Sequence, residues 1–235
     1  MKIAYLVLEE HPYGREMLRV LLENSQIPGL IIQEVSSVGD IERDKFLQRI
    51  NGQPVPPRLN EIITGEKIPV YCVKNHNDQE TQDLLINFNP DLLVLGGTRI
   101  IKPNILKIPK IATINSHPGL LPVLRGSASV GWALYKDLPQ GATVHFIDPG
   151  IDTGDIIIKR ELKIYRNDTY ESINYRIGLL AGRLMSEAIS LIAKGNPPRQ
   201  SQDLNLGETY KVIPDELLEE GKQRLVSGQY SHFSD

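Results

Sequence analysis

An amide, an imidazole and a carboxylate stand out at the ends of apolar runs in this sequence. Asn115 and His117 lie two residues apart in "INSHPGLLPVLRG" (114–126), and Asp152 lies in "GIDTGD" (150–155). Together they suit acyl transfer to an incoming amine. The amide can stabilise the oxyanion, the imidazole can accept the proton that the amine loses, and the carboxylate can orient the imidazole and favour its charged form. No covalent enzyme intermediate is needed, because the amine supplies the nucleophile.

Other interpretations of these residues are open. A histidine beside a loop is often just a hydrogen-bonded polar residue, and an asparagine or aspartate at a strand end often forms a turn. A serine hydrolase is disfavoured because "SASVG" (127–131) lacks the first glycine of a nucleophile elbow, and a nicotinamide enzyme because no G-x-G-x-x-G follows the first apolar run. We expect no metal site, since no metal-loop template matches His145, Asp148, Asp152 and Asp155.

The elements that must position these residues alternate between strands and helices. Apolar runs predict strands over residues 2–8, 30–37, 68–73, 90–97, 110–115, 141–148 and 154–164. Helical spacing predicts helices over residues 13–24, 77–88, 127–137 and 169–195. This order predicts an α/β fold with a doubly wound, mostly parallel sheet, whose last two strands are antiparallel because their link is short. Ligands bind such sheets beyond the carboxyl ends of the strands, where the candidate residues fall.

The composition indicates a globular domain. The 235 residues are 40% hydrophobic, which suffices for a core, and no apolar run reaches the length of a membrane span. The N-terminal run leads into two glutamates without a signal-peptide cleavage site, and the single cysteine, Cys72, excludes an internal disulfide; we expect a core thiol. These features favour a cytoplasmic protein. The net charge of −3, without a strongly basic block, disfavours general nucleic-acid binding.

The stretch from "INSHPGLLPVLRG" through "WALYKDLPQGATVHFIDPGIDTGDII" resembles the folate-dependent formyltransferase family. That family includes glycinamide ribonucleotide, methionyl-tRNA and sugar N-formyltransferases, and the similarity runs from about residue 68 to residue 165. The resemblance implies a Rossmann-like formyltransferase fold and 10-formyltetrahydrofolate as co-substrate. It also implies that Asn115, His117 and Asp152 form the catalytic set, with a supporting role for His145 in "TVHF".

The resemblance further implies where the folate lies. In the family it sits between the loop after the strand at 90–97 and the loop that holds the aspartate. The cofactor-binding candidates are therefore Gly97, Thr98, Arg99, Ile100 and Ile101 on one side and Gly150 and Ile151 on the other. Core packing is the alternative for Ile100 and Ile101, since a pterin pocket is itself largely apolar.

Departures from the family patterns bear on the acceptor. The chain reads "LEEHPYGRE" (8–16) where the purine enzyme has a glycine- and serine-rich phosphate loop, and two glutamates there would repel a phosphate. Residues 196–235 are too few for the C-terminal β-barrel of the methionyl-tRNA enzyme and not basic enough to attract tRNA. We expect a catalytic domain at 1–195, a C-terminal extension at 196–235, and as acceptor the amine of a nucleotide-linked amino sugar.

Two alternatives for the function stay open. One is a glycinamide ribonucleotide formyltransferase with an unusual first loop, and the other is a folate-binding homologue that has lost the reaction. Residues 40–68 are expected to form an excursion at the sheet edge, and the tail is loosely patterned apart from a short helix at 214–224. Tyr210 in the tail either packs or stacks on a base or sugar. An exposed edge strand is compatible with a homodimer.

Overall fold

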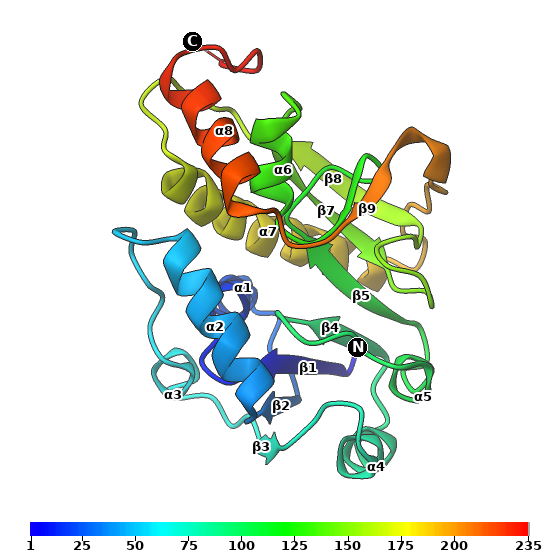
Figure 1. The fold of residues 1–235 in the computed structure, drawn as a ribbon. Helices are drawn as coiled ribbons and strands as arrows, with labels where there is room; N and C mark the ends of the chain where they lie inside the picture. Colours follow the sequence, from blue (N-terminus) through cyan, green and yellow to red (C-terminus); the bar gives the residue numbers. More distant parts are fainter. Residues whose placement is uncertain (235) are drawn as a thin grey trace.

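The structure, a computed structural model, describes residues 1–234 (Figure 1). In this part of the chain seven strands form one sheet in the order β3-β2-β1-β4-β5-β7-β8. They are β1 (Ile3–Leu8), β2 (Leu30–Glu34), β3 (Val70–Val73), β4 (Leu92–Leu95), β5 (Ala112–His117), β7 (Gly141–Phe146) and β8 (Ile156–Glu161). Strands β1 to β5 pair in parallel, whereas β7 and β8 pair antiparallel with their neighbours. The predicted α/β fold with a mostly parallel sheet is confirmed.

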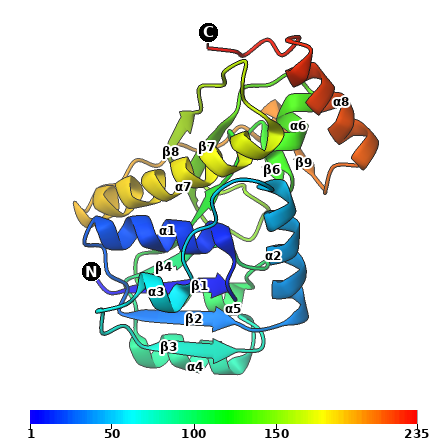
Figure 2. The same cartoon turned by 90° about the vertical axis from the view of Figure 1, so that its left-hand side faces the viewer.

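Helices cover both faces of the sheet, as a parallel sheet requires. They are α1 (Pro12–Glu23), α4 (Gln79–Phe88), α5 (Pro103–Leu106) and α7 (Tyr170–Ala193). Successive side chains of β1 point to opposite faces: Tyr5 packs in the core under α1 and α7, and Leu6 packs in the core under α4 and α5. Figure 2 shows α1 and α7 side by side on their face. The sheet therefore lies between two hydrophobic cores, one on each face.

The chain reverses direction after β5, and this reversal builds the site. Strand β7 returns antiparallel beside β5, so that Asn115 lies opposite His145 and His117 lies opposite Thr143. The register between β7 and β8 shifts between Val144 and His145. Such bulges re-aim side chains and are frequent next to active sites. Polar residues far apart in the sequence thereby come to lie on adjacent strands.

The segment that connects β2 to the edge strand β3, and β3 itself, bear on two expectations. Residues 40–68 contain the C-terminal part of α2 (Ser37–Arg49), whose N-terminus is capped by the hydroxyl of Ser36, and the short α3 (Leu59–Ile62). The prediction of a core thiol at Cys72 is wrong, because Cys72 is exposed on β3. Strand β3 is at the edge of the sheet, and an apolar run in the sequence does not reveal which strand takes the edge.

The C-terminal extension is more regular than its sequence pattern indicates. Strand β9 (Glu208–Tyr210) pairs in parallel with β6 (Leu124–Gly126), which begins seven residues after His117. Helix α8 (Asp215–Val226) packs on α6 (Ser129–Tyr135), so the predicted short helix is present. The division of the chain at residue 195 stays a prediction, but the segment after it contacts the elements that surround the site.

Candidate active site

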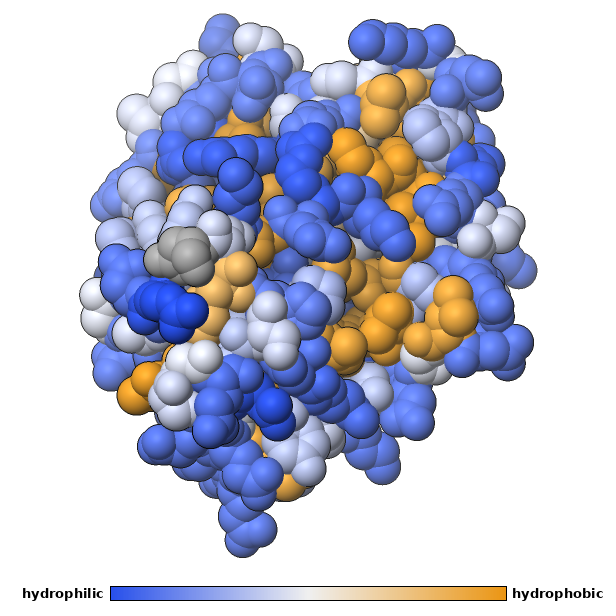
Figure 3. Space-filling view, turned by 90° about the horizontal axis from the view of Figure 1, so that it is seen from above, coloured by the Kyte–Doolittle hydropathy of each residue, from blue (hydrophilic) through white to orange (hydrophobic). Residues whose placement is uncertain are grey.

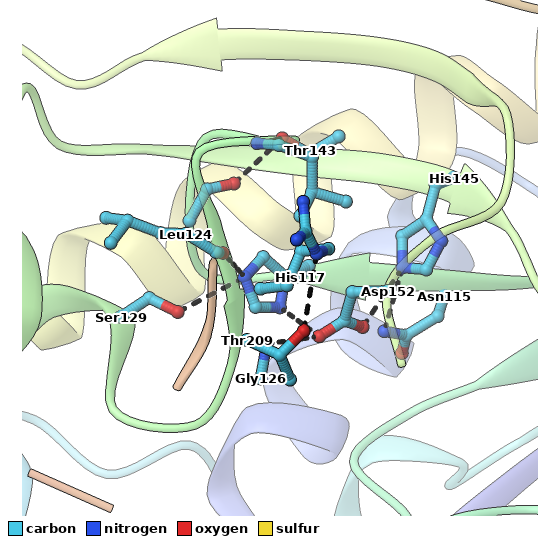
Figure 4. Close-up of polar contacts among 12 residues, drawn as sticks. Asn115, His117, Leu124, Gly126, Ser129, Thr143, His145, Asp152 and Thr209 are labelled. Carbon is cyan, nitrogen blue, oxygen red and sulfur yellow. Dashed lines mark hydrogen bonds and ion pairs between the residues drawn. The ribbon is translucent and has the colours of Figure 1, made fainter. Parts of the chain in front are cut away.

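The three predicted catalytic side chains lie together at the carboxyl end of β5 (Figure 4). Asn115 and His117 are on β5, and Asp152 is on the loop between β7 and β8. Oδ2 of Asp152 lies 3.3 Å from Nδ1 of His117, and Oδ1 lies 3.5 Å from Nε2 of His145. Nδ2 of Asn115 lies 3.5 Å from the same His145 nitrogen. The structure thus brings together one amide, two imidazoles and one carboxylate.

His117 is 2% exposed and is held by the segment that follows it. Its Nε2 lies 2.6 Å from the carbonyl oxygen of Leu124 and 3.1 Å from Oγ of Ser129. Because a carbonyl oxygen can only accept, Nε2 carries a proton, and Nδ1 is the nitrogen that can take up another. Burial lowers the pKa of His117 and outweighs Asp152, whose charge raises it. The imidazole is therefore neutral at neutral pH and able to act as a base.

Asp152 is kept in its charged form by several partners. The N–H of Gly126 donates to Oδ2 at 2.8 Å. Burial opposes the charge, but His117, His145 and this N–H outweigh burial and hold the pKa of Asp152 well below its usual value. The backbone of Asp152 has a φ of 54°, in the left-handed region. This conformation costs a non-glycine residue about 1–2 kcal/mol, so the surrounding contacts must hold it.

His145 orients the amide. Its Nδ1 donates to the carbonyl oxygen of Phe146 at 2.9 Å, and this bond turns Nε2 towards Nδ2 of Asn115, 3.5 Å away. Both histidines are buried, whereas Asn115 and Asp152 are partly exposed. A reacting group therefore reaches the cluster from the side of Asn115 and Asp152, where an N–H donor and a carboxylate meet it.

The sequence matches the family model described as formyl transferase over residues 1–189. The chain belongs to the formyl transferase family. A curated relative, the methionyl-tRNA formyltransferase of Clostridioides difficile (strain 630), is 32% identical over 187 residues, which cover 79% of this chain and 57% of that protein. This family member spans between 48% and 67% of the length of the three curated relatives that head the comparison.

Solved structures of other formyl transferases share the fold. A sugar N-formyltransferase from Shewanella sp FDAARGOS_354 has a TM-score of 0.67 at 16% identity, over 96% of this chain and 88% of that chain. The formyltransferase PseJ from Anoxybacillus kamchatkensis has a TM-score of 0.57 at 22% identity, over 94% of this chain and 99% of that chain. The PseJ structure is a complex with UDP-4,6-dideoxy-4-formamido-L-AltNAc and tetrahydrofolate. At these identities the likeness shows the fold of this formyl transferase.

The loop after β4, predicted to line the folate, turns two adjacent isoleucines in opposite directions. Ile100 is 78% exposed, whereas Ile101 is 7% exposed and packs in the core with side chains of β4. The core-packing alternative therefore holds for Ile101 and not for Ile100. Only Ile100 presents an apolar side chain on the surface of this loop.

A buried carboxylate holds the same loop in place. Glu34, at the end of β2, accepts hydrogen bonds from the guanidinium of Arg99, with Nε 2.9 Å from Oε2, and from the N–H of His76 at 2.8 Å. Gly97 has a φ of 79°, which favours glycine, and Thr98 beside it is half-buried. The Arg99 side chain is thus occupied by its hydrogen bonds to Glu34. The groups of this loop that can contact a ligand are its backbone, the side chain of Thr98 and the side chain of Ile100.

The second predicted folate loop runs directly into Asp152. Oδ1 of Asp148 accepts from the N–H of Gly150 at 3.0 Å and from the hydroxyl of Thr153 at 2.6 Å, and these bonds tighten the turn. Ile151 at its tip is 49% exposed. Exposed isoleucines on both predicted folate loops fit the flat face of a heteroaromatic ring such as a pterin, which would cover them.

The groups that hold His117 and Asp152 have little sequence signal. Leu124 and Gly126 act through backbone atoms, so their side-chain types do not indicate these contacts. Ser129 lies in "SASVG" (127–131), which lacks the first glycine of a nucleophile elbow, yet its Oγ lies within hydrogen-bond distance of Nε2 of His117. These contacts follow from the tertiary fold, and the types of the side chains in the sequence do not predict them.

A cavity of about 380 Å³ borders the segment that follows His117. It is lined by Leu120, Leu121, Val123, Leu124, Leu138, Pro139, Lys159, Arg160 and Glu161. Figure 3, which views the molecule from above Figure 1, shows apolar side chains gathered around a depression. Within residues 1–234 no three His, Cys, Asp or Glu side chains are placed to hold a metal ion, and no helix there is long and apolar enough to cross a membrane.

Proposed function

We propose that this chain transfers the formyl group of 10-formyltetrahydrofolate to the primary amine of a small substrate. The observation that carries the proposal is the meeting of Asn115, His117 and Asp152 at the carboxyl end of β5. Membership of the formyl transferase family supports the reaction class. Family membership does not identify the acceptor, because this chain matches only 57% of the length of the first curated relative.

Each of the three side chains has a defined task in this reaction. The folate supplies the formyl carbon and the nitrogen that leaves it. Asn115 donates an N–H where negative charge develops on the formyl oxygen as the amine adds to the carbon. Nδ1 of His117 accepts the proton that the amine loses and returns it to the departing folate nitrogen as the old carbon–nitrogen bond breaks. Asp152, 3.3 Å from Nδ1, stabilises the imidazolium in between.

We place the folate against the two loops that carry Ile100 and Ile151. Both side chains are large, apolar and exposed. Each follows or precedes a residue that is held by hydrogen bonds: Ile100 follows Arg99, and Ile151 precedes Asp152. Covering such a side chain fully contributes about 1.5–3 kcal/mol, which suits contact with the flat face of an aromatic ring. Backbone groups of the two loops then hydrogen-bond its polar edge.

For the acceptor we propose an amino sugar carried on a nucleotide. The fold match to the Shewanella sugar N-formyltransferase covers 96% of this chain, so it includes most of residues 196–235. The PseJ complex contains a formylated amino sugar on a nucleotide together with tetrahydrofolate. Tyr210 on β9 packs on Trp132 of α6, with ring centroids 4.8 Å apart, so the tail contacts α6 through this aromatic pair.

Two other acceptors are supported by specific observations. Curated relatives that are 32% and 34% identical to this chain over their matched residues are methionyl-tRNA formyltransferases, which favours methionyl-tRNA. Glycinamide ribonucleotide gains support from the first loop, where Glu10 pairs with Arg15 at 2.9 Å and accepts from the N–H of Leu59. Because Glu10 is compensated, the expected repulsion of a phosphate rests on Glu9 alone.

An acceptor panel tests the proposal. The protein is incubated with 10-formyltetrahydrofolate and, separately, amino-sugar nucleotides, glycinamide ribonucleotide and methionyl-tRNA, and release of tetrahydrofolate is followed. We expect the highest kcat/KM with an amino-sugar nucleotide. A higher value with either other acceptor would replace the acceptor and keep the reaction. Folate binding in a calorimeter without release on any amine would instead identify a folate-binding homologue.

A further inference from the structure

The C-terminal extension lies across the loop that carries Asp152. Its chain exchanges two backbone hydrogen bonds with Ile156 at the start of β8. Nε2 of Gln202 then donates to the carbonyl oxygens of Asp152, at 3.0 Å, and Gly154, at 2.6 Å. One side chain therefore ties two peptide groups of the turn that presents the carboxylate.

The extension also braces the strand that donates to that carboxylate. Strand β9 pairs with β6, whose Gly126 donates its N–H to Oδ2 of Asp152 (Figure 4). The buried side chain of Arg125 on β6 donates to the carbonyl oxygens of Gly207 at 2.8 Å and Leu204 at 3.3 Å. Both the backbone and the carboxylate of Asp152 are thus held by groups that depend on the extension.

These contacts matter because the Asp152 backbone is in the left-handed region, which is less favourable than the usual regions even for an aspartate, so that contacts to this turn stabilise it. We propose that Gln202 is a positioning residue, whose two hydrogen bonds hold the Asp152 backbone so that the carboxylate meets Nδ1 of His117. The catalytic consequence of this inference rests on the proposed function. The placement of the carboxylate against His117 does not, and it can be measured separately.

Two variants and a matched control test the kinetic consequence. Gln202→Leu removes both donations at similar size, and Gln202→Met does so with a side chain that adapts to its surroundings. Gln200→Leu is the control, because the Gln200 side chain is exposed and its backbone bonds to Ile156 persist. We expect kcat to fall roughly tenfold to a hundredfold in both Gln202 variants, the KM values to change less, and the control to match wild type.

A double variant shows whether Gln202 acts through the carboxylate. In an Asp152→Asn background, Gln202→Leu should cause little further loss of kcat, because the carboxylate that it positions is already absent. Losses that multiply in the double variant would overturn the proposal. So would a kcat for the Gln202 variants equal to that of the control.

An NMR titration of His117 decides the structural part even where formyl transfer fails. The ionisable groups that face His117 are Asp152, which raises its pKa, and His145, which lowers it. Displacing the carboxylate should lower the pKa of His117 by about half a unit or more in Gln202→Leu and Gln202→Met. An unchanged pKa in folded protein would overturn the proposal whatever the activity, and thermal unfolding of each variant confirms that it is folded.

Discussion

Nε2 of His117 lies 2.6 Å from the carbonyl oxygen of Leu124, which can only accept a hydrogen bond. This contact fixes the proton on Nε2 and leaves Nδ1 as the basic nitrogen, on the side of Asp152. A proton taken up from a substrate therefore arrives beside a carboxylate whose pKa is held well below its usual value. Proton transfer through His117 depends on this arrangement.

Replacing Asp152 should slow the reaction without disturbing the backbone, since asparagine also adopts the left-handed region. Asp152→Asn removes the charge that raises the pKa of His117, so the imidazolium is less stable. An opposite charge at this distance is worth about 1–3 pKa units, and we expect kcat to fall roughly ten- to a thousandfold. Steady-state kinetics measures the loss, with Asp155→Asn on the same loop as control. Similar rates in both variants would refute the role of Asp152.

Removing the amide of Asn115 should affect the transition state more than substrate binding. The N–H is needed where charge develops, so Asn115→Ala should lower kcat about 10²–10³-fold with little change in KM. Asn104→Ala, at an exposed position on α5, is the matched control and should match wild type. A rise in KM at constant kcat would mean that Asn115 only binds substrate.

The adjacent residues Ile100 and Ile101 should respond differently to truncation. Ile101→Ala removes a core side chain and should lower the free energy of unfolding by about 2–4 kcal/mol. Ile100→Ala should change stability by less than about 0.5 kcal/mol. Its KM for 10-formyltetrahydrofolate should rise about tenfold, as expected for the loss of buried apolar contact. Urea unfolding and donor titrations provide the two readouts. An unchanged donor KM in Ile100→Ala would remove this residue from the folate site.

Acidification should destabilise the protein through its buried imidazoles. Burial lowers the pKa of His76 to about 4 and that of His11 to about 3, against about 6.5 in an unfolded chain. The unfolded state therefore binds more protons, and the free energy of unfolding falls as pH drops from about 6.5 towards 4, by up to about 1.4 kcal/mol per pH unit for each imidazole.

Urea unfolding at several pH values measures this slope. His76→Gln keeps a donor for the Ile32 carbonyl oxygen, which accepts from His76 at 3.1 Å, and should flatten the slope. His232→Gln, at an exposed position, should leave it unchanged. Equal stability at about pH 7 and pH 5 would contradict the assignment of neutral, buried histidines.

The sheet and the meeting of the candidate catalytic side chains could be predicted because they follow from strand order. Continuous apolar runs mark β1 and β4, and parallel strands end at one edge, where Asn115 and His117 were expected. The antiparallel pairing of β7 and β8 followed from their short link. Sequence patterns carry this information because burial on both faces demands apolar residues throughout a strand.

The contacts that fix the site could not be predicted in the same way. Strands β6 and β9 have three residues each, too few to show a period, and Arg125 meets Gly207 across 82 residues. Ile100 and Ile101 are identical in type, so only the path of the loop decides which one is buried. The hydrogen bonds of Gln202 end on backbone carbonyl oxygens, which leave no trace in residue identity.

The role of His117 as the base that accepts the amine proton is tested most directly by His117→Asn. Release of tetrahydrofolate is measured for wild type and variant at saturating 10-formyltetrahydrofolate and the best acceptor, with donor binding followed by calorimetry. We predict that the rate falls roughly 10²–10⁴-fold while the donor still binds. A variant that transfers formyl groups at the wild-type rate would contradict the account.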